Sequence, residues 1–227
     1  MDSARIAELL SPFLDRPLSE SQFKDISTYI DILLRWNLKL NLTAIRDPEE
    51  IVTRHFGESL FAARHLFPCA ETGRVGAGLR PGQAELGSAL RVADVGSGAG
   101  FPGLPIKLCV PEIHLTLIES TQKKATFLRE VVRALAFTNV DVFAGRAEEL
   151  PGGSADVVTL RAVERFDSVL PVAARLVAPE GCMALFIGDK QASRVSELAR
   201  GFNWSERLTI PLSSERILLI GLREREA

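Results

Sequence analysis

The residues best suited to bind a ligand lie in a glycine-rich stretch over residues 91–105, with the sequence RVADVGSGAGFPGLP. An apolar run over residues 92–95 stops at Gly96, and three more glycines follow at Gly98, Gly100 and Gly103. This pattern predicts a strand that breaks into a tight turn and opens a helix, because glycine adopts backbone angles that other residues avoid and lets a ligand approach closely. The N-terminus of that helix offers free N–H groups and a positive dipole end to an anion.

Asp94 indicates which ligand to expect at this turn. A carboxylate two residues before the first glycine disfavours a pyrophosphate and favours a cation such as a free amino group. S-adenosylmethionine offers an ammonium group for Asp94 and a carboxylate for the helix N-terminus. The spacing Gly98-x-Gly100-x-x-Gly103 also matches the dinucleotide fingerprint, so an NAD(P) site and a purely structural turn remain as alternatives.

The composition limits the kinds of protein to which this chain can belong. The chain has 227 residues, of which 46% are hydrophobic and 25% charged, as is typical of a soluble globular domain with a small accessory segment. It has no apolar stretch of the roughly 20 residues that a membrane span needs, and its N-terminus lacks the features of a secretory signal. We therefore expect a cytoplasmic monomer without membrane contact. The cysteines Cys69, Cys109 and Cys182 lack metal-ligand spacing, so we expect free thiols and no metal site.

The net charge of −2 gives no support for nucleic-acid binding by the molecule as a whole. An RNA partner therefore requires a local basic face. Six basic residues near the glycine-rich stretch could form one, although a solvated helix surface is the more common role of such residues: Lys107, Lys123, Lys124, Arg129, Arg133 and Arg146.

The first part of the chain, residues 1–69, carries helical patterns. Ser19 and Gln22 have the spacing of a capping box, and Asp47 followed by Pro48 is typical of a helix start. We expect His55, on the helix that follows, to be a hydrogen-bonded structural residue. Residues 70–89 are rich in glycine and predict a loop between this helical segment and the main domain, residues 90–227.

From residue 90 onward, strand and helix patterns alternate, which predicts a doubly wound, mostly parallel α/β sheet covered on both faces. The expected strands are Arg91–Val95, His114–Ile118, Val140–Phe143, Ala155–Leu160 and Cys182–Ile187. The expected helices lie near residues 103–110, 121–136, 164–177 and 190–200. Two further strand-like runs, Ser205–Pro211 and Arg216–Leu222, are separated by too few residues for a crossover helix. They predict a C-terminal antiparallel hairpin and a seven-stranded sheet of the kind found in S-adenosylmethionine-dependent methyltransferases.

Acidic residues follow the second and third predicted strands. Glu119, at the carboxyl end of the strand next to the glycine turn, can accept hydrogen bonds from both ribose hydroxyls of an adenosine; a solvated strand-end carboxylate is the alternative. After the third strand, Glu148 is suited to the adenine amino group and the Ala147 backbone N–H to a ring nitrogen. A helix-start acid is the alternative for Glu148.

Arg161 follows the fourth predicted strand, whose carboxyl end borders the crevice in which this topology binds ligands. An arginine there can contact the donor's carboxylate, the target base or an RNA phosphate, and the sequence does not distinguish these roles.

These motifs together resemble the glucose-inhibited division B family, bacterial enzymes that methylate guanine N7 in small-subunit ribosomal RNA. The resemblance spans most of residues 30–165. The matching segments are RWNLKLNLTAI (35–45), the helix with His55 and Ser59, DVGSGAGFPGLPIKL (94–108), LIES with Lys123 and Lys124, GRAEEL (145–150) and LRAV (160–163).

The resemblance implies a methyl donor, S-adenosylmethionine, a small-subunit ribosomal RNA or ribosomal particle as acceptor, and a catalytic role for Arg161. The donor contacts that it implies, or that the glycine turn predicts, are Asp94, Gly96, Gly98, Gly100, Phe101, Glu119, Ser120, Thr121, Ala147, Glu148 and Arg161. Three features depart from the family pattern: Glu58 replaces an aspartate, Gly188-Asp189-Lys190 stands where Lys-Gly is expected, and residues 70–89 are an insertion.

Two motifs that the chain lacks limit which atom can accept the methyl group. An Asn/Asp-Pro-Pro-aromatic loop, usual for methylation of exocyclic amino groups, does not follow the fourth strand, and neither Cys109 nor Cys182 is placed to attack a pyrimidine. Guanine N7 needs neither device, because its lone pair is nucleophilic and no proton leaves the reacting atom. An NAD(P)-dependent oxidoreductase and a non-catalytic RNA-binding assembly factor are the alternative functions.

Overall fold

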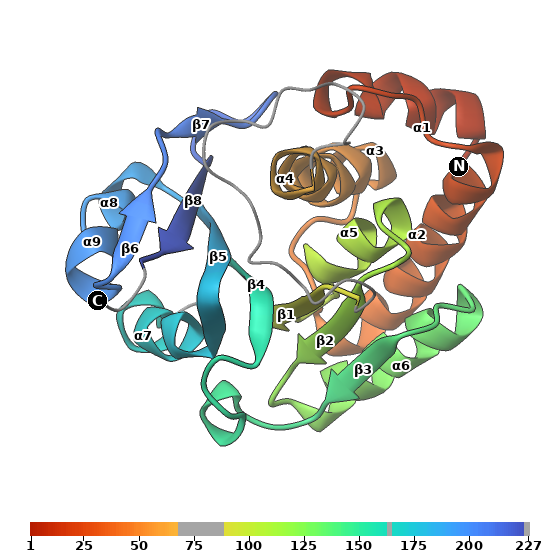
Figure 1. Cartoon of the computed structure of the whole chain (residues 1–227). Helices are drawn as coiled ribbons and strands as arrows, with labels where there is room; N and C mark the ends of the chain where they lie inside the picture. Colours follow the sequence, from red (N-terminus) through yellow and green to blue (C-terminus); the bar gives the residue numbers. More distant parts are fainter. Residues whose placement is uncertain (68–88, 163–164, 225–227) are drawn as a thin grey trace.

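The computed structural model describes residues 1–67, 89–162 and 165–224 of the chain (Figure 1). Its centre is an eight-stranded sheet with the order β3-β2-β1-β4-β5-β8-β6, in which β7 also pairs with β8. Strands β1 to β5 run parallel to one another, and β8 runs antiparallel to β5, β6 and β7. The strands are β1 Arg91–Val95, β2 His114–Ile118, β3 Val140–Phe143, β4 Ala155–Arg161, β5 Val177–Ile187, β6 Phe202–Trp204, β7 Leu208–Thr209 and β8 Ile217–Arg223.

The predicted doubly wound sheet and its antiparallel C-terminal strands are confirmed, but the predicted number of seven strands is wrong. Strand β6 was not predicted, because three residues are too few to show an alternating pattern. It pairs with the end of β8. The predicted hairpin is β7 paired with β8, although β7 covers only Leu208 and Thr209. Pro211 lacks the N–H that a longer ladder would need.

The helices that follow the sheet strands lie where they were predicted, with one difference. They are α5 Gly103–Cys109, α6 Gln122–Ala134, α7 Phe166–Leu176, α8 Asp189–Ala192 and α9 Val195–Leu198. A single helix was predicted over residues 190–200, but the structure divides this region into α8 and α9. The Ser193 hydroxyl donates to the Lys190 carbonyl oxygen at 3.0 Å, a local bond that competes with continuous helix.

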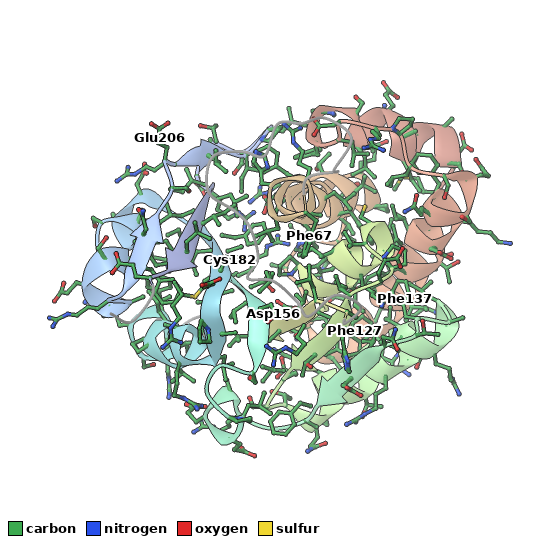
Figure 2. All side chains as sticks on the ribbon, in the orientation of Figure 1. Phe67, Phe127, Phe137, Asp156, Cys182 and Glu206 are labelled. Atoms are coloured by element: carbon green, nitrogen blue, oxygen red, sulfur yellow. The ribbon has the colours of Figure 1, made fainter. Side chains whose placement is uncertain are left out.

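The N-terminal helices cover one face of the sheet together with α5 and α6, whereas α7, α8 and α9 lie on the other side (Figure 1). They are α1 Ser3–Leu10, the 3₁₀ turn η1 Ser11–Phe13, α2 Glu20–Leu40, α3 Pro48–Ile51, the π-helical segment η2 Val52–Gly57 and α4 Glu58–Leu66. One continuous core joins Ile30 and Phe56 from these helices to Leu117 of β2 and Phe127 of α6, which is labelled in Figure 2. The N-terminal segment therefore shares its core with the sheet.

Two predicted helix starts are confirmed. The Ser19 hydroxyl oxygen accepts from the Gln22 backbone N–H, and Gln22 Oε1 accepts from the Ser19 N–H at 2.8 Å, which completes the capping box. Asp47 Oδ1 accepts from the Glu50 N–H at 2.9 Å. Nearly all of the predicted 70–89 loop, and Cys69, lie outside the described residues.

Candidate active site at the carboxyl ends of the strands

The glycine-rich turn follows β1 and is tied to its neighbours on both sides. Gly96, Gly98 and Gly100 have φ angles of 70°, 55° and 85°, which L-residues with side chains rarely adopt. The Gly96 N–H donates to the Ile118 carbonyl oxygen at 3.0 Å. On the opposite side, the Tyr29 hydroxyl of α2 donates to the Ala99 carbonyl oxygen at 2.5 Å. A Cβ at Gly100 would collide with that hydroxyl, so the turn and α2 require glycine at this position.

The carboxylate of Asp94, which was expected to bind a ligand, is bonded within the protein. Its side chain is buried, with Oδ1 accepting from the Thr159 hydroxyl at 2.7 Å and Oδ2 from the Gly103 N–H at 3.3 Å. Burial raises the pKa of this carboxyl to about 6, against an ordinary value of 3.8. Asp94 therefore links β1 to β4 and to the start of α5.

An open cavity of about 170 Å³ lies beside the turn, at the carboxyl ends of β1 and β2. It brings together five of the residues predicted to bind a ligand: Gly96, Glu119, Ser120, Ala147 and Glu148. Four apolar side chains, Gly145 and Arg146 form the rest of the lining; the apolar residues are Val95, Ile118, Val169 and Val172. Sites for small molecules combine such apolar walls with a few polar groups.

Glu119 is the buried acid of this cavity. Its Oε2 accepts from the Gly98 N–H at 3.0 Å, and its Oε1 accepts from the Thr121 N–H at 2.8 Å. These bonds fix the carboxylate between the glycine turn and the start of α6. Each oxygen keeps a second lone pair, so the group can still accept two hydrogen bonds from a ligand.

The segment that carries Ala147 and Glu148 is held by an arginine that the sequence analysis did not single out. This segment is the 3₁₀ turn η4, Ala147–Glu149. Arg175, at the end of α7, donates from Nη2 to the carbonyl oxygens of Ala147 at 3.3 Å, Glu148 at 3.1 Å and Leu150 at 2.8 Å. No local pattern could have indicated this role, because the partners lie on separate elements.

Arg161, at the end of β4, is buried and does not line the 170 Å³ cavity. Its Nη2 donates to the Arg54 carbonyl oxygen at 2.7 Å and to His55 Nδ1 at 2.9 Å, and lies 3.3 Å from Glu58 Oε2. Burial lowers the pKa of this guanidinium to about 10. Its Nη1 is buried and has no hydrogen-bond partner among the residues that the structure describes.

Glu58 is the carboxylate around which this part of the site is built. It is 1% exposed, and its Oε1 accepts from Arg54 Nε at 3.2 Å and from Arg216 Nη2 at 3.0 Å. Together with Arg161, three guanidinium groups therefore surround one carboxylate, which leaves the cluster positively charged. The sequence analysis noted Glu58 only as a departure from a family pattern and missed Arg216, because 158 positions separate the two residues.

Phe101 connects the glycine turn to these charges. Its ring stacks on Tyr29, with centroids 5.3 Å apart and planes at 5°, and on His55, with centroids 4.6 Å apart and planes at 18°. His55 is hydrogen-bonded, as expected, but it also contacts both Arg161 and Phe101, which the sequence did not indicate.

A second cavity, of about 400 Å³, lies near the start of β5 and shares only Arg175 with the residues described above. Its lining consists of Ala174, Arg175, Arg200, Gly201, Phe202, Arg223 and Glu224. None of the predicted site residues contributes to it, so its larger volume does not make it the candidate site.

The described residues contain neither a membrane-spanning helix nor a metal-binding group of side chains. No helix in that part of the chain is long and apolar enough to span a bilayer. The same residues contain no group of three or more acidic, histidine or cysteine side chains arranged to hold a metal ion. Cys109 and Cys182, the latter labelled in Figure 2, are free thiols, as predicted.

Comparison with solved structures supports the fold. A predicted O-methyltransferase from Agrobacterium tumefaciens superposes with a TM-score of 0.51, at 18% identity over 59% of this chain and 74% of that one.

Sequence comparison is more specific. A protein of Exiguobacterium sp. named ribosomal RNA small subunit methyltransferase G is 42% identical over 154 residues, which cover 65% of this chain and 57% of that protein. A protein of the same name from Xanthomonas oryzae pv. oryzae is 33% identical over 97% of this chain and 98% of its own length. A family model matches residues 22–216. The chain belongs to the GidB family, described as rRNA small subunit methyltransferase G.

Proposed function

We propose that this protein transfers a methyl group from S-adenosylmethionine to N7 of a guanine in small-subunit ribosomal RNA. The family supplies the reaction class. The observation that carries the proposal is the buried Glu119 carboxylate, which two backbone N–H groups hold at the wall of the cavity beside Gly96.

The residues present fit the nucleoside part of the donor. Glu119 would accept from the ribose hydroxyls, and Ala147 and Glu148 would contact the adenine through a backbone N–H and a carboxylate. Gly96 would allow close approach of the ligand because it has no side chain. The cavity of about 170 Å³ is smaller than the several hundred Å³ usual for whole-ligand sites, consistent with a site for one end of the molecule.

Arg161 is the proposed catalytic residue. It ends β4, the strand beside β1, and ligands of open α/β sheets bind beyond these carboxyl ends. A buried donor without a partner costs about 1–3 kcal/mol, so Arg161 Nη1 would gain from an acceptor atom on the donor or the RNA. An arginine is also the side chain most often found on the O6/N7 edge of guanine.

His55 is not available as a general base, which agrees with N7 as the acceptor. His55 has both ring nitrogens in hydrogen bonds, and burial lowers its pKa well below the ordinary value. S-adenosylmethionine would supply an electrophilic methyl carbon, and guanine N7 has a lone pair to meet it. The residues of the site would then act by alignment, which can contribute about 7–11 kcal/mol to lowering a barrier.

The remaining expectations belong to the same proposal. We propose that the protein acts as a cytoplasmic monomer, needs no metal, and meets its RNA either free or in a ribosomal particle. With a net charge of −2, it should bind free RNA weakly and with a shallow dependence on salt.

Calorimetry and RNA mapping test the proposal together. Wild-type protein should bind S-adenosylmethionine and not NADH, and Glu119→Gln should weaken donor binding by about tenfold, since a charged acceptor is lost. Glu130→Gln, at a partly buried position on α6 that does not line the cavity, is the matched control and should bind as wild type does. NADH binding without donor binding would contradict the proposal in favour of an oxidoreductase.

Strand cleavage at N7-methylguanine in RNA from cells with and without the gene tests the acceptor. The modification should disappear with the gene. Donor binding without any change in modification would contradict the catalytic role and favour an assembly factor.

A further inference from the structure

The segment η2 departs from α-helical geometry at the point where it meets Arg161. Val52–Gly57 form a π-helix between α3 and α4, and π-helical turns are rare and often occur at functional sites. Two acceptors from this segment, the Arg54 carbonyl oxygen and His55 Nδ1, share one nitrogen of Arg161, at 2.7 and 2.9 Å. The N-terminal helices therefore hold the guanidinium that ends β4.

The chemistry of these groups fixes the form of His55. A guanidinium only donates hydrogen bonds, so Nδ1 must be the acceptor and the proton of the neutral ring must be on Nε2. That proton points to the Thr43 hydroxyl oxygen, 2.8 Å away. Protonation of Nδ1 would place two donors 2.9 Å apart, beside the further positive charges of Arg54 and Arg216. Two carboxylates face the same cluster: Glu58, and Glu50, whose Oε1 lies 3.9 Å from Arg54 Nη1.

The ring of His55 makes a second contact with the site. It stacks on Phe101 at 4.6 Å, and Phe101 in turn stacks on Tyr29 at 5.3 Å. Phe101 belongs to the glycine-rich turn, whereas Arg161 ends β4. One side chain from the N-terminal helices thus contacts both halves of the proposed site.

We propose that His55 is a positioning residue, which in its neutral form holds the Arg161 guanidinium by a hydrogen bond and the Phe101 ring by stacking. The inference rests on the proposed function, because Arg161 and Phe101 matter to turnover only if the site transfers a methyl group. It also goes beyond that function, since it assigns a role in the reaction to a residue that does not line the donor cavity.

Two substitutions of His55 test its hydrogen bond to Arg161 and its stacking on Phe101 separately. His55→Asn keeps an acceptor atom close to the place of Nδ1 but loses the stacking ring, whereas His55→Phe keeps a ring and loses the acceptor. His65→Phe is the matched control: His65 lies on α4, is partly buried, and its Nδ1 bonds to the Phe61 carbonyl oxygen at 2.8 Å.

We expect His55→Phe to lower kcat by at least about tenfold, as loss of a hydrogen bond to a charged group predicts, with little change in the KM for the donor. His55→Asn should keep most of kcat and raise the donor KM severalfold. His65→Phe should match wild type in both constants. Equal kcat for His55→Phe and His65→Phe, with equal thermal midpoints, would overturn the proposal.

Nitrogen NMR of labelled histidine provides a readout that does not depend on methyl transfer. Below the ordinary histidine pKa of about 6.5, His55 should remain neutral with Nδ1 unprotonated, and Arg161→Met should shift the Nδ1 resonance because Nδ1 loses its hydrogen-bond donor. A protonated Nδ1 in the wild type would overturn the inference even if the enzyme methylates RNA. Failure of the wild type to methylate RNA, with the NMR result as expected, would instead contradict the proposed function.

Discussion

The buried carboxyl of Asp94 should make the free energy of unfolding depend on pH. The substitution Asp94→Asn should remove this contribution. The pKa of the Asp94 carboxyl is about 6 in the folded protein and 3.8 in an unfolded chain. The folded state therefore holds a proton that the unfolded state releases between these two pH values. Stability from this group is highest below pH 3.8, falls as the pH rises, and is lowest above about 6.

The magnitude follows from the difference between the two pKa values. At 1.36 kcal/mol for each pH unit, a pKa raised from 3.8 to about 6 costs about 3 kcal/mol above pH 6. Between pH 4.5 and 7 the change is about 2 kcal/mol. Asp94→Asn cannot ionise and escapes this loss, although it gives up the bond from the Gly103 N–H.

Urea unfolding of wild type and Asp94→Asn at pH 4.5 and 7.0 measures this difference directly. The free energy of unfolding of the variant, relative to wild type, should rise by about 2 kcal/mol between the two pH values. Asp31→Asn, an exposed position on α2, should run parallel to wild type. Parallel profiles for wild type and Asp94→Asn would refute the argument, because they would mean that Asp94 carries the same charge in both states.

Two further substitutions test how the site is supported. Gly100→Ala places a side chain at a φ of 85° and against the Tyr29 hydroxyl. In a denaturant titration it should lower the unfolding free energy by about 1–3 kcal/mol. An unchanged midpoint would show that α2 does not fix the turn. Arg175→Met removes three hydrogen bonds to the backbone around η4. Calorimetry should show binding of S-adenosylmethionine weakened about tenfold, even though Arg175 does not line the 170 Å³ cavity. Wild-type affinity in that variant would mean that η4 keeps its shape without Arg175.

Features that depend on neighbours along the chain were determined by the sequence alone. Strands β1, β2 and β3 have the bounds that their apolar runs predicted, and the caps at Ser19 and Asp47 form as their spacing indicated. Glu119 and Ala147 meet at one cavity because parallel strands bring their carboxyl ends to the same edge. Topology therefore indicated that these two residues come together, whereas six of the eleven predicted site residues do not line this cavity.

Only the tertiary structure decided what those side chains contact. Asp94 bonds to Thr159 and Gly103, and the sequence carries no sign of a partner 65 positions away. The arginine cluster around Glu58 and the contacts of His55 arise because the N-terminal helices pack over the ends of β1 and β4. The physical reason is the range of the forces: periodicity and capping act within a few residues, whereas desolvation and charge pairing depend on elements that meet only in the folded chain.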